Sequence, residues 1–180
     1  MIYKSILTLF TVSAMVFLME STAYAQPYGT GTYSSAVPYG AQTSLSMSAS
    51  SGVLLSIDPA ATGTLGMTAG TVTVYSTDVA GYKLYIKAVG STDMTRDLLV
   101  IPASLNATLA SLAVNTWGYN TTGAANFIGV STTDALLKNA TGPYASGDTT
   151  TVTYGLNIDR RKAAGSYSSN VMYTAVPQTN

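Results

Sequence analysis

The sequence predicts an all-β fold, and three observations support this prediction. Short apolar runs alternate with polar residues at a period of two, which is typical of half-buried strands. Gly, Pro, Asn and Asp interrupt these runs every 8–12 residues or so, as in sheets built from short strands. No long segment has the 3.6-residue apolar period of an amphipathic helix. With 180 residues, of which 47% are apolar, the chain is long enough for one domain with its own core.

The first half of the domain predicts several strands in succession. Residues 44–50 alternate Leu45, Met47 and Ala49 with serines, which indicates one buried face. Residues 52–58 form a short apolar run that ends at Asp58-Pro59, and residues 61–70 are expected to be a connection interrupted by glycines. Strands are expected at 70–77 and 81–90, the latter with the clearest alternation in the chain.

The second half continues the pattern with one expected exception. Residues 97–105 form an apolar run that stops at Pro102, and residues 105–114 carry leucines at i, i+4 and i+7, which favours a helical turn. Residues 115–119 and 126–130 are expected to pair as a hairpin. Two long strands follow at 149–158 and 166–176, joined by a turn at 159–165. About nine short strands with this spacing predict an immunoglobulin-like antiparallel β-sandwich.

The first 25 residues have the parts of a secretory signal peptide. Lys4 supplies a positive charge, residues 6–18 are uncharged and mostly apolar, and Ala23-Tyr24-Ala25 offers a small-x-small cleavage site before Gln26. The apolar run of 13 residues is shorter than the roughly 20 that a membrane-spanning helix needs. We therefore expect cleavage between Ala25 and Gln26, no membrane span after cleavage, and a secreted or cell-surface location.

The rest of the chain divides into a linker, one domain and a short tail. Residues 26–42 are rich in Gly, Ser, Thr, Tyr and Pro and have no apolar period, which predicts a flexible linker. Residues 43–177 form the predicted β-sandwich domain, and residues 178–180 form the tail. The linker is also a candidate donor for strand pairing between molecules, although its prolines weaken it as a ladder partner.

The composition excludes several classes of function. Eight basic and eight acidic residues leave no net field to attract nucleic acid. Without cysteine or histidine, the chain has no disulfide, no thiolate chemistry, no serine-histidine catalytic arrangement and no histidine-based zinc site. We predict that the protein is not an enzyme and holds no metal or cofactor.

The single tryptophan, Trp117, permits two interpretations. An exposed indole could be a stacking platform for a carbohydrate, whereas a buried indole would be a large part of a small core. Trp117 and Tyr119 point the same way along one predicted strand, and we interpret them as core aromatics. The polar loop that follows is the better candidate for ligand binding because loops of this kind lie on the surface. Its candidate residues are Asn120, Thr121, Thr122 and Asn126.

The segments GYKLYIKAVGS, NTWGYN, DTTTVTYGLNID and AGSYSSNVMYTAV occur in this order. As a set they resemble a pattern found in secreted β-sandwich surface proteins, of the adhesin or pilus-like kind, mainly from ultra-small, host-attached bacteria. The resemblance covers residues 44–177 and implies a cell-surface or pilus-like role. It departs from the pattern at Arg160, Arg161 and Lys162, which we interpret as a solvated turn or, alternatively, as a contact site for anionic polymers.

These observations lead to a leading hypothesis and a rival. The leading hypothesis is a secreted, non-catalytic structural or adhesive subunit of the cell surface, which assembles with itself or with other subunits through its edge strands. The rival is a monomeric extracellular module that binds glycans or host-cell proteins through the loops around residues 120–126.

Overall fold

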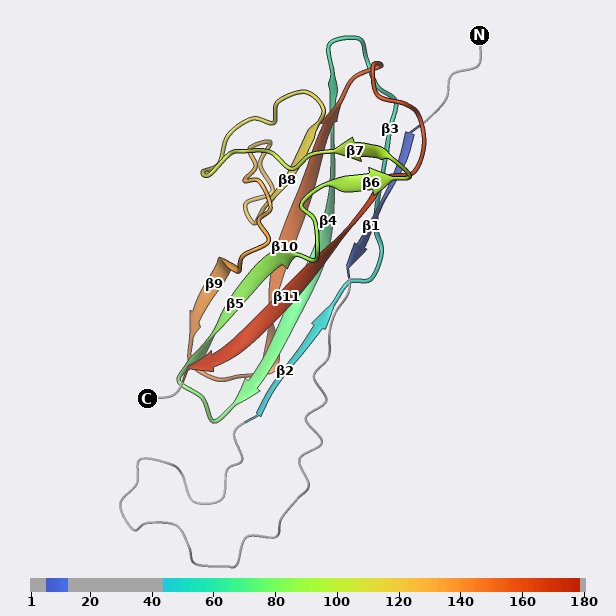
Figure 1. Ribbon diagram of the computed structural model, residues 1–180. Helices are drawn as coiled ribbons and strands as arrows, with labels where there is room; N and C mark the ends of the chain where they lie inside the picture. Colours follow the sequence, from blue (N-terminus) through green and yellow to red (C-terminus); the bar gives the residue numbers. More distant parts are fainter. Residues whose placement is uncertain (1–5, 13–43, 179–180) are drawn as a thin grey trace, which may run out of the picture.

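The computed structural model describes residues 6–12 and 44–178, and these form eleven strands in two sheets (Figure 1). The strands are β1 (Ile6–Val12), β2 (Ser44–Ala49), β3 (Val53–Ile57), β4 (Thr64–Thr77), β5 (Gly81–Ala88), β6 (Met94–Arg96), β7 (Leu99–Ile101), β8 (Thr116–Asn120), β9 (Ala135–Thr141), β10 (Tyr144–Ile158) and β11 (Ser168–Gln178). The predictions for the signal peptide cleavage site, the linker and the last two residues of the tail fall on residues outside these ranges.

The larger sheet has seven strands, of which five follow the order β3-β1-β11-β5-β9. The small strands β6 and β7 pair with each other, and β6 joins the sheet through a single pairing with β11. All of these pairings are antiparallel except that of β1 with β11, which is parallel. Strand β1 therefore lies between β3 and β11, and both of its edges are paired.

The smaller sheet has four strands in the order β2-β4-β10-β8, all antiparallel. Its centre is the long pair β4 and β10, whose register runs from Ser76 opposite Tyr144 to Thr64 opposite Ile158. Along β4, Val72 and Val74 are buried while their neighbours Thr71 and Tyr75 are exposed. This alternation buries one face of the sheet against the larger sheet.

The core lies between the two sheets and consists mainly of aliphatic and aromatic side chains from facing strands. Its largest fully buried members are Trp117, Tyr82, Tyr154 and Tyr167. Phe127 is also fully buried, but it packs over Gly118 and Gly155 on the other face of the smaller sheet. The predicted antiparallel β-sandwich is thus confirmed as the fold class. From Ser44 onward the structure has ten strands where about nine were predicted.

Two local predictions were wrong because tertiary pairing overrode a local pattern. The glycine-interrupted segment 61–70 is not a connection, since most of it belongs to β4 and pairs with β10 up to Ile158. The leucines of 105–114 do not form a helical turn. Leu105 is fully exposed, Leu112 is buried, and Ala110 forms an isolated antiparallel bridge with Phe127.

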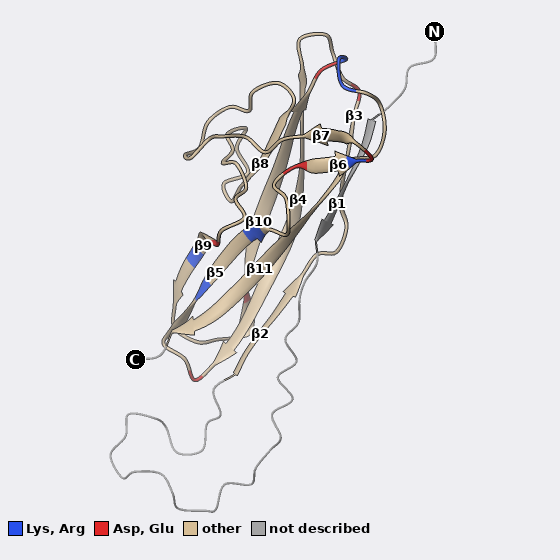
Figure 2. Ribbon diagram, viewed as in Figure 1, with Lys and Arg blue, Asp and Glu red and all other residues tan. Residues whose placement is uncertain are grey.

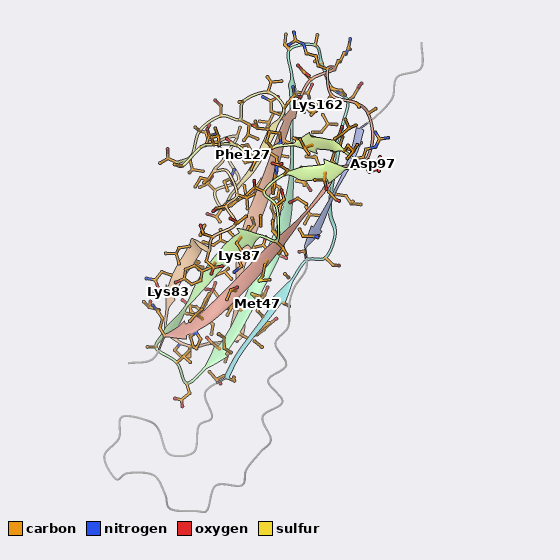
Figure 3. The ribbon with its side chains drawn as sticks, viewed as in Figure 1. Met47, Lys83, Lys87, Asp97, Phe127 and Lys162 are labelled. Atoms are coloured by element: carbon orange, nitrogen blue, oxygen red, sulfur yellow. The ribbon has the colours of Figure 1, made fainter. Side chains whose placement is uncertain are left out.

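The predicted hairpin of 115–119 with 126–130 is reduced to one isolated bridge. Tyr119 and Ile128 exchange both backbone hydrogen bonds, with N···O distances of 2.9 and 2.8 Å. The ladder partner of β8 is instead β10, which comes much later in the chain. Strand β9, which the sequence did not predict, forms one end of the larger sheet beside β5. Figure 3 shows Lys83 and Lys87 on that side of the molecule.

Candidate functional site

The loop after β8 is organised by the side chain of Asn120. Its amide nitrogen donates to the carbonyl oxygens of Ala124 and Asn126, both at 2.8 Å, and its Oδ1 accepts from the backbone N–H groups of Thr122 and Gly123. Only 1% of Asn120 is exposed. The Asn120 side chain therefore stabilises the loop from inside. It is not available for the binding role that the sequence predicted for it.

The other predicted residues of this loop lie on the surface. Thr121, Thr122 and Asn126 are all exposed. The segment then turns inward at Phe127, which is fully buried. Residues 121–126 thus form a small exposed polar loop held on a rigid base, and three of the four predicted loop residues are accessible to a partner.

The basic turn after β10 is partly neutralised by its surroundings. Arg160 donates from Nε to the carbonyl oxygen of Pro59 at 3.0 Å, and Lys162 donates from Nζ to that of Val100 at 2.8 Å. Asp159 accepts from the backbone of Arg161 and from Asn115. Burial alone would raise the pKa of the Asp159 carboxyl, but these hydrogen bonds and the nearby cations hold its pKa below the usual value.

Arg161 is the most available cation of the turn, because 89% of its side chain is exposed. Figure 2 shows the basic turn at one tip of the sandwich. The structure does not bring this turn together with the polar loop. Asn120 pairs with Thr153 of β10, and Arg160 follows Thr153 by seven residues, in the turn after β10. At about 3.3 Å per residue, the two predicted sites are on the order of 20 Å apart along the strand.

Trp117 lies in the core. It is 0% exposed, and its indole Nε1 donates to the carbonyl oxygen of Thr92 at 2.9 Å. Tyr119 is also buried, and burial raises the pKa of its phenol. In this structure neither ring offers an exposed face on which a sugar could stack.

A glycine pair explains how the segment around Phe127 closes over β8. Gly118 in β8 lies opposite Gly155 in β10. A β-carbon at Gly155 would collide with the ring of Phe127, and one at Gly118 would lie 2.5 Å from the carbonyl oxygen of Ile128. The absence of side chains at these two positions lets the returning segment lie flat on the sheet.

A polar cluster that the sequence did not reveal lies between β5, β9 and β10. Asp148 accepts from the Tyr82 hydroxyl at 2.7 Å and from Lys138 Nζ at 2.6 Å. Tyr144 packs edge-on against Tyr82, with ring centroids 5.8 Å apart. Asp148 belongs to a Ser-Gly-Asp segment that looks like an ordinary turn, so only the pairing of distant strands identifies the cluster.

Electrostatics favour the charged form of Asp148 and the neutral form of Tyr82. Burial by itself raises the pKa of Asp148, but the hydrogen bonds from Lys138 and Tyr82 outweigh it and hold the pKa below the usual value. Burial, together with the hydrogen bond to Asp148, raises the pKa of Tyr82. The cluster is a charge-assisted network that ties the two sheets together.

Exposed aliphatic side chains lie on the β6–β7 hairpin and on the connection that follows it. Leu98, in the turn of this hairpin, is 97% exposed, and Leu105 in the following connection is 100% exposed. The hairpin lies next to the basic turn through the hydrogen bond from Lys162 to Val100. The signal in the sequence was the nearly continuous apolar run DLLVI, of which only Ile101 is buried, whereas Leu98, Leu99 and Val100 are exposed.

The described residues show no other arrangement that suggests chemistry. Within 6–12 and 44–178, no group of three or more His, Cys, Asp or Glu residues could hold a metal ion. No helix in these ranges is both long and apolar enough to cross a membrane. No protein-family model matches the chain, and a search of curated proteins gives no match.

Proposed function

We propose that this protein is a secreted, non-catalytic subunit of the cell surface, with a structural or adhesive role, which assembles by adding strands to its sheets. The proposal joins the predicted signal peptide to the architecture of the sandwich. A sheet that ends in an unprotected strand can accept a strand from a neighbouring molecule, because its outer N–H and C=O groups have no partner within the sheet.

The observation that carries the proposal is the composition of β2, which ends the smaller sheet. Its sequence SLSMSA contains no charged residue and no proline, the two features with which proteins usually block edge-to-edge pairing. At the opposite end of this sheet, the outer edge of β8 is covered by other segments of the chain. Segments around Ala103 and Ile128 form bridges along it and cover its outer edge.

The larger sheet ends in β9, which resembles β2 in this respect. Among the described residues no strand lies beyond it, and Leu136 is 54% exposed. Lys138 is its only charged residue, and that side chain is engaged by Asp148. The low content of charged residues, 9% of the chain, also favours close association between copies, because little charge must be desolvated.

Fractionation of native cells tests the location and the assembly together. After gentle shearing, immunoblots and electron microscopy would compare filaments, washed envelope and culture fluid. We expect the protein in a filament or in a multimeric envelope fraction. Recovery only as a free monomer in the medium would contradict the structural role.

A pair of variants tests the role of the β2 edge. Ser46 is exposed on this edge strand, so Ser46→Lys should reduce assembly by adding a charge that a neighbouring strand must desolvate. Thr151→Lys is the matched control, because Thr151 is exposed on β10 at the centre of the same sheet. Equal assembly of both variants would remove the β2 edge from the mechanism.

A binding module for glycans or host-cell proteins is the second candidate. The exposed Leu98 and Leu105 and the exposed Arg161 favour it, because large exposed aliphatic side chains can mark protein contacts. Under this function, Leu98→Ser combined with Leu105→Ser should weaken binding to host cells. The same variant should leave assembly unchanged.

A further inference from the structure

Strand β3 has β1 as its only ladder partner among the described residues. Five residues of β1 pair with β3, from Ile6 opposite Ile57 to Phe10 opposite Val53. Strand β3 nevertheless contributes three buried residues to the core, Val53, Leu55 and Ile57. Without β1, β3 would lose its backbone hydrogen bonds to the larger sheet, although its three buried side chains belong to the core.

The same strand also completes β11. Residues Leu9 to Val12 pair in parallel with Ser168 to Val171. This stretch of β11 also pairs through Ser168 with β6 and through Val171 with β5, and the Asn170 carbonyl oxygen accepts from the Val89 N–H group. Figure 1 shows β1 running between β3 and β11. Removing it would expose two facing rows of unpaired backbone groups, which is costly in a core-forming sheet.

Residues 6–12 lie inside the segment that the sequence identifies as a signal peptide. Cleavage before Gln26 would therefore remove β1 from the mature protein. The fold would then contain a gap of one strand width between β3 and β11. We name this gap the β3–β11 slot.

We propose that in the mature protein the β3–β11 slot accepts a strand from the N-terminal segment of a second copy. This inference rests on the proposed function, and it adds to the open β2 edge a second acceptor in the larger sheet, together with its donor. Once in place, the donor would restore the hydrogen bonds of β1 and cover Val53, Leu55 and Ile57. Each copy would offer one slot and one donor, so that the contact is heterologous and can propagate into a chain of subunits.

The sequence of the N-terminal segment points to residues 31–37 as the donor. Prolines at 27 and 38 border a stretch without proline that is longer than the seven residues of β1, so that every donor residue can give its N–H to the ladder. Aligning 31–37 with 6–12 places Tyr33 and Val37 at positions 8 and 12. The β1 residues at these positions pair with the buried Leu55 and Val171. A shift by one residue in either direction would place only Thr, Ser, Ala or Pro at positions 8, 10 and 12.

The length of the chain favours a second copy over the same molecule. In this alignment Val37 would lie beside Val171, whereas β2 begins at Ser44 opposite Thr77. A short turn joins Thr77 to Gly81. Ser44, which lies opposite Thr77, is therefore near the same end of the sandwich as Gln178, which lies opposite Gly81. Along β11, Gln178 is seven residues from Val171, which corresponds to about 23 Å. Ser44 belongs to the other sheet, and the spacing between the two sheets adds about 10 Å at right angles to β11.

The same molecule would have to bridge this separation of roughly 25 Å with seven Cα–Cα steps. A fully extended chain spans at most about 3.6 Å per residue, so that the connection would have no slack. Its sequence, Pro38-Tyr39-Gly40 followed by three more residues, favours a turn instead. A donor from a second copy has no such constraint.

Disulfide trapping tests the proposal, because the natural chain has no cysteine. The alignment places Ser34 at the position of Leu9, directly opposite Leu54, which is 53% exposed. Directly opposed residues of paired strands have the Cα separation that a disulfide needs. Full-length Ser34→Cys and Leu54→Cys chains with different tags would be co-expressed, exported and analysed on non-reducing gels, and the N-terminus of each would be determined.

We expect mature chains that begin at Gln26 and a disulfide-linked dimer that contains both tags. The matched control replaces Leu54→Cys with Thr151→Cys, an exposed position on the other sheet, and should give no dimer above background. Three results would overturn the proposal: retention of residues 6–12 in the exported protein, dimers equally abundant with the control, or a disulfide that forms only within a chain that carries both Ser34→Cys and Leu54→Cys.

The outcomes separate this inference from the proposed function. Filaments or multimeric envelope material without the specific dimer would leave the surface role intact and reject the slot. The specific dimer in protein that is recovered only from the culture fluid would support the slot and contradict the role in a surface assembly.

Discussion

The hydroxyl oxygens of Tyr154 in β10 and Tyr173 in β11 lie 2.5 Å apart and join the two sheets through the core. Both side chains are buried, so that each phenol loses water and gains the other as a partner. Burial raises the pKa of Tyr154 well above its ordinary value. It also raises the pKa of Tyr173 to about 12, against the lowering effect of the hydrogen bond from Tyr154.

The first prediction concerns the strength of this link. Tyr173→Phe should lower the free energy of unfolding by about 1 kcal/mol, because a buried hydroxyl loses a hydrogen-bond partner. Tyr154→Phe should act similarly, and the double variant should lose less than the sum of the two single changes. Urea denaturation of the four proteins measures the coupling. Strict additivity would show that the two hydroxyls do not interact in solution.

The second prediction concerns alkaline pH. Both phenols must be neutral in the fold, and their pKa values are raised above the unfolded value of about 10. Their contribution to stability is therefore complete below pH ~10 and is lost as pH rises through the folded values. Denaturation midpoints should fall above pH ~10, and this fall should be smaller in the Tyr154→Phe, Tyr173→Phe double variant. An equal fall in both proteins would assign the alkaline loss to other groups.

The third prediction concerns Asp148, whose pKa is lowered in the fold by its hydrogen bonds from Lys138 and Tyr82. A lowered pKa stabilises the fold above the unfolded value of about 3.9, and the contribution is lost as pH falls through the folded value. Asp148→Asn should therefore cost ~0.5–1 kcal/mol at neutral pH, and the difference should shrink below pH ~4. The amide oxygen can still accept from Tyr82, so the variant isolates the charge. A difference that is constant with pH would exclude the ion pair as its cause.

The fourth prediction concerns the contact between Gly155 and Phe127. Gly155→Ala should lower the free energy of unfolding by ~1–3 kcal/mol, because the added methyl group collides with the ring in a closely packed site. Thr151→Ala, at an exposed position of the same strand, is the control and should change little. Combining Gly155→Ala with Phe127→Leu should cost less than the two changes add up to, as the smaller side chain leaves room. Thermal denaturation compares the wild type with Gly155→Ala, Phe127→Leu, their double variant and the Thr151→Ala control.

The alternation of apolar and polar residues predicted the fold class and most of the strands, because one face of each sheet is buried. The pattern worked best where a strand has a covered and an open face, as in β2, β4 and β5. It failed where pairing with distant segments decides the structure. Residues 61–70 look like a connection by their glycines, yet β10 extends far enough to hold them in the ladder.

The candidate site was less predictable for the same reason. Asn120 was predicted to begin the loop, but it is the last residue of β8, and its four hydrogen bonds to the loop backbone depend on the path of residues 122–126. The cluster joins Lys138 and Asp148, which lie on successive strands, to Tyr82, which lies 66 residues before Asp148 in the sequence. Residues 6–12 showed the opposite problem, since their apolar sequence predicts part of a signal peptide, whereas in the structure they form the strand between β3 and β11.

The last prediction distinguishes a core tryptophan from a carbohydrate platform. Trp117 is the only tryptophan, so that fluorescence reports on it alone. An indole that is 0% exposed and donates to Thr92 should emit at short wavelength and resist quenching by acrylamide, and soluble glycans should leave its emission unchanged. Trp117→Ala should destabilise the fold by ~3–5 kcal/mol, because a large buried side chain leaves a cavity. Ready quenching, or a stable Trp117→Ala protein that has lost glycan binding, would instead make the indole a ligand platform.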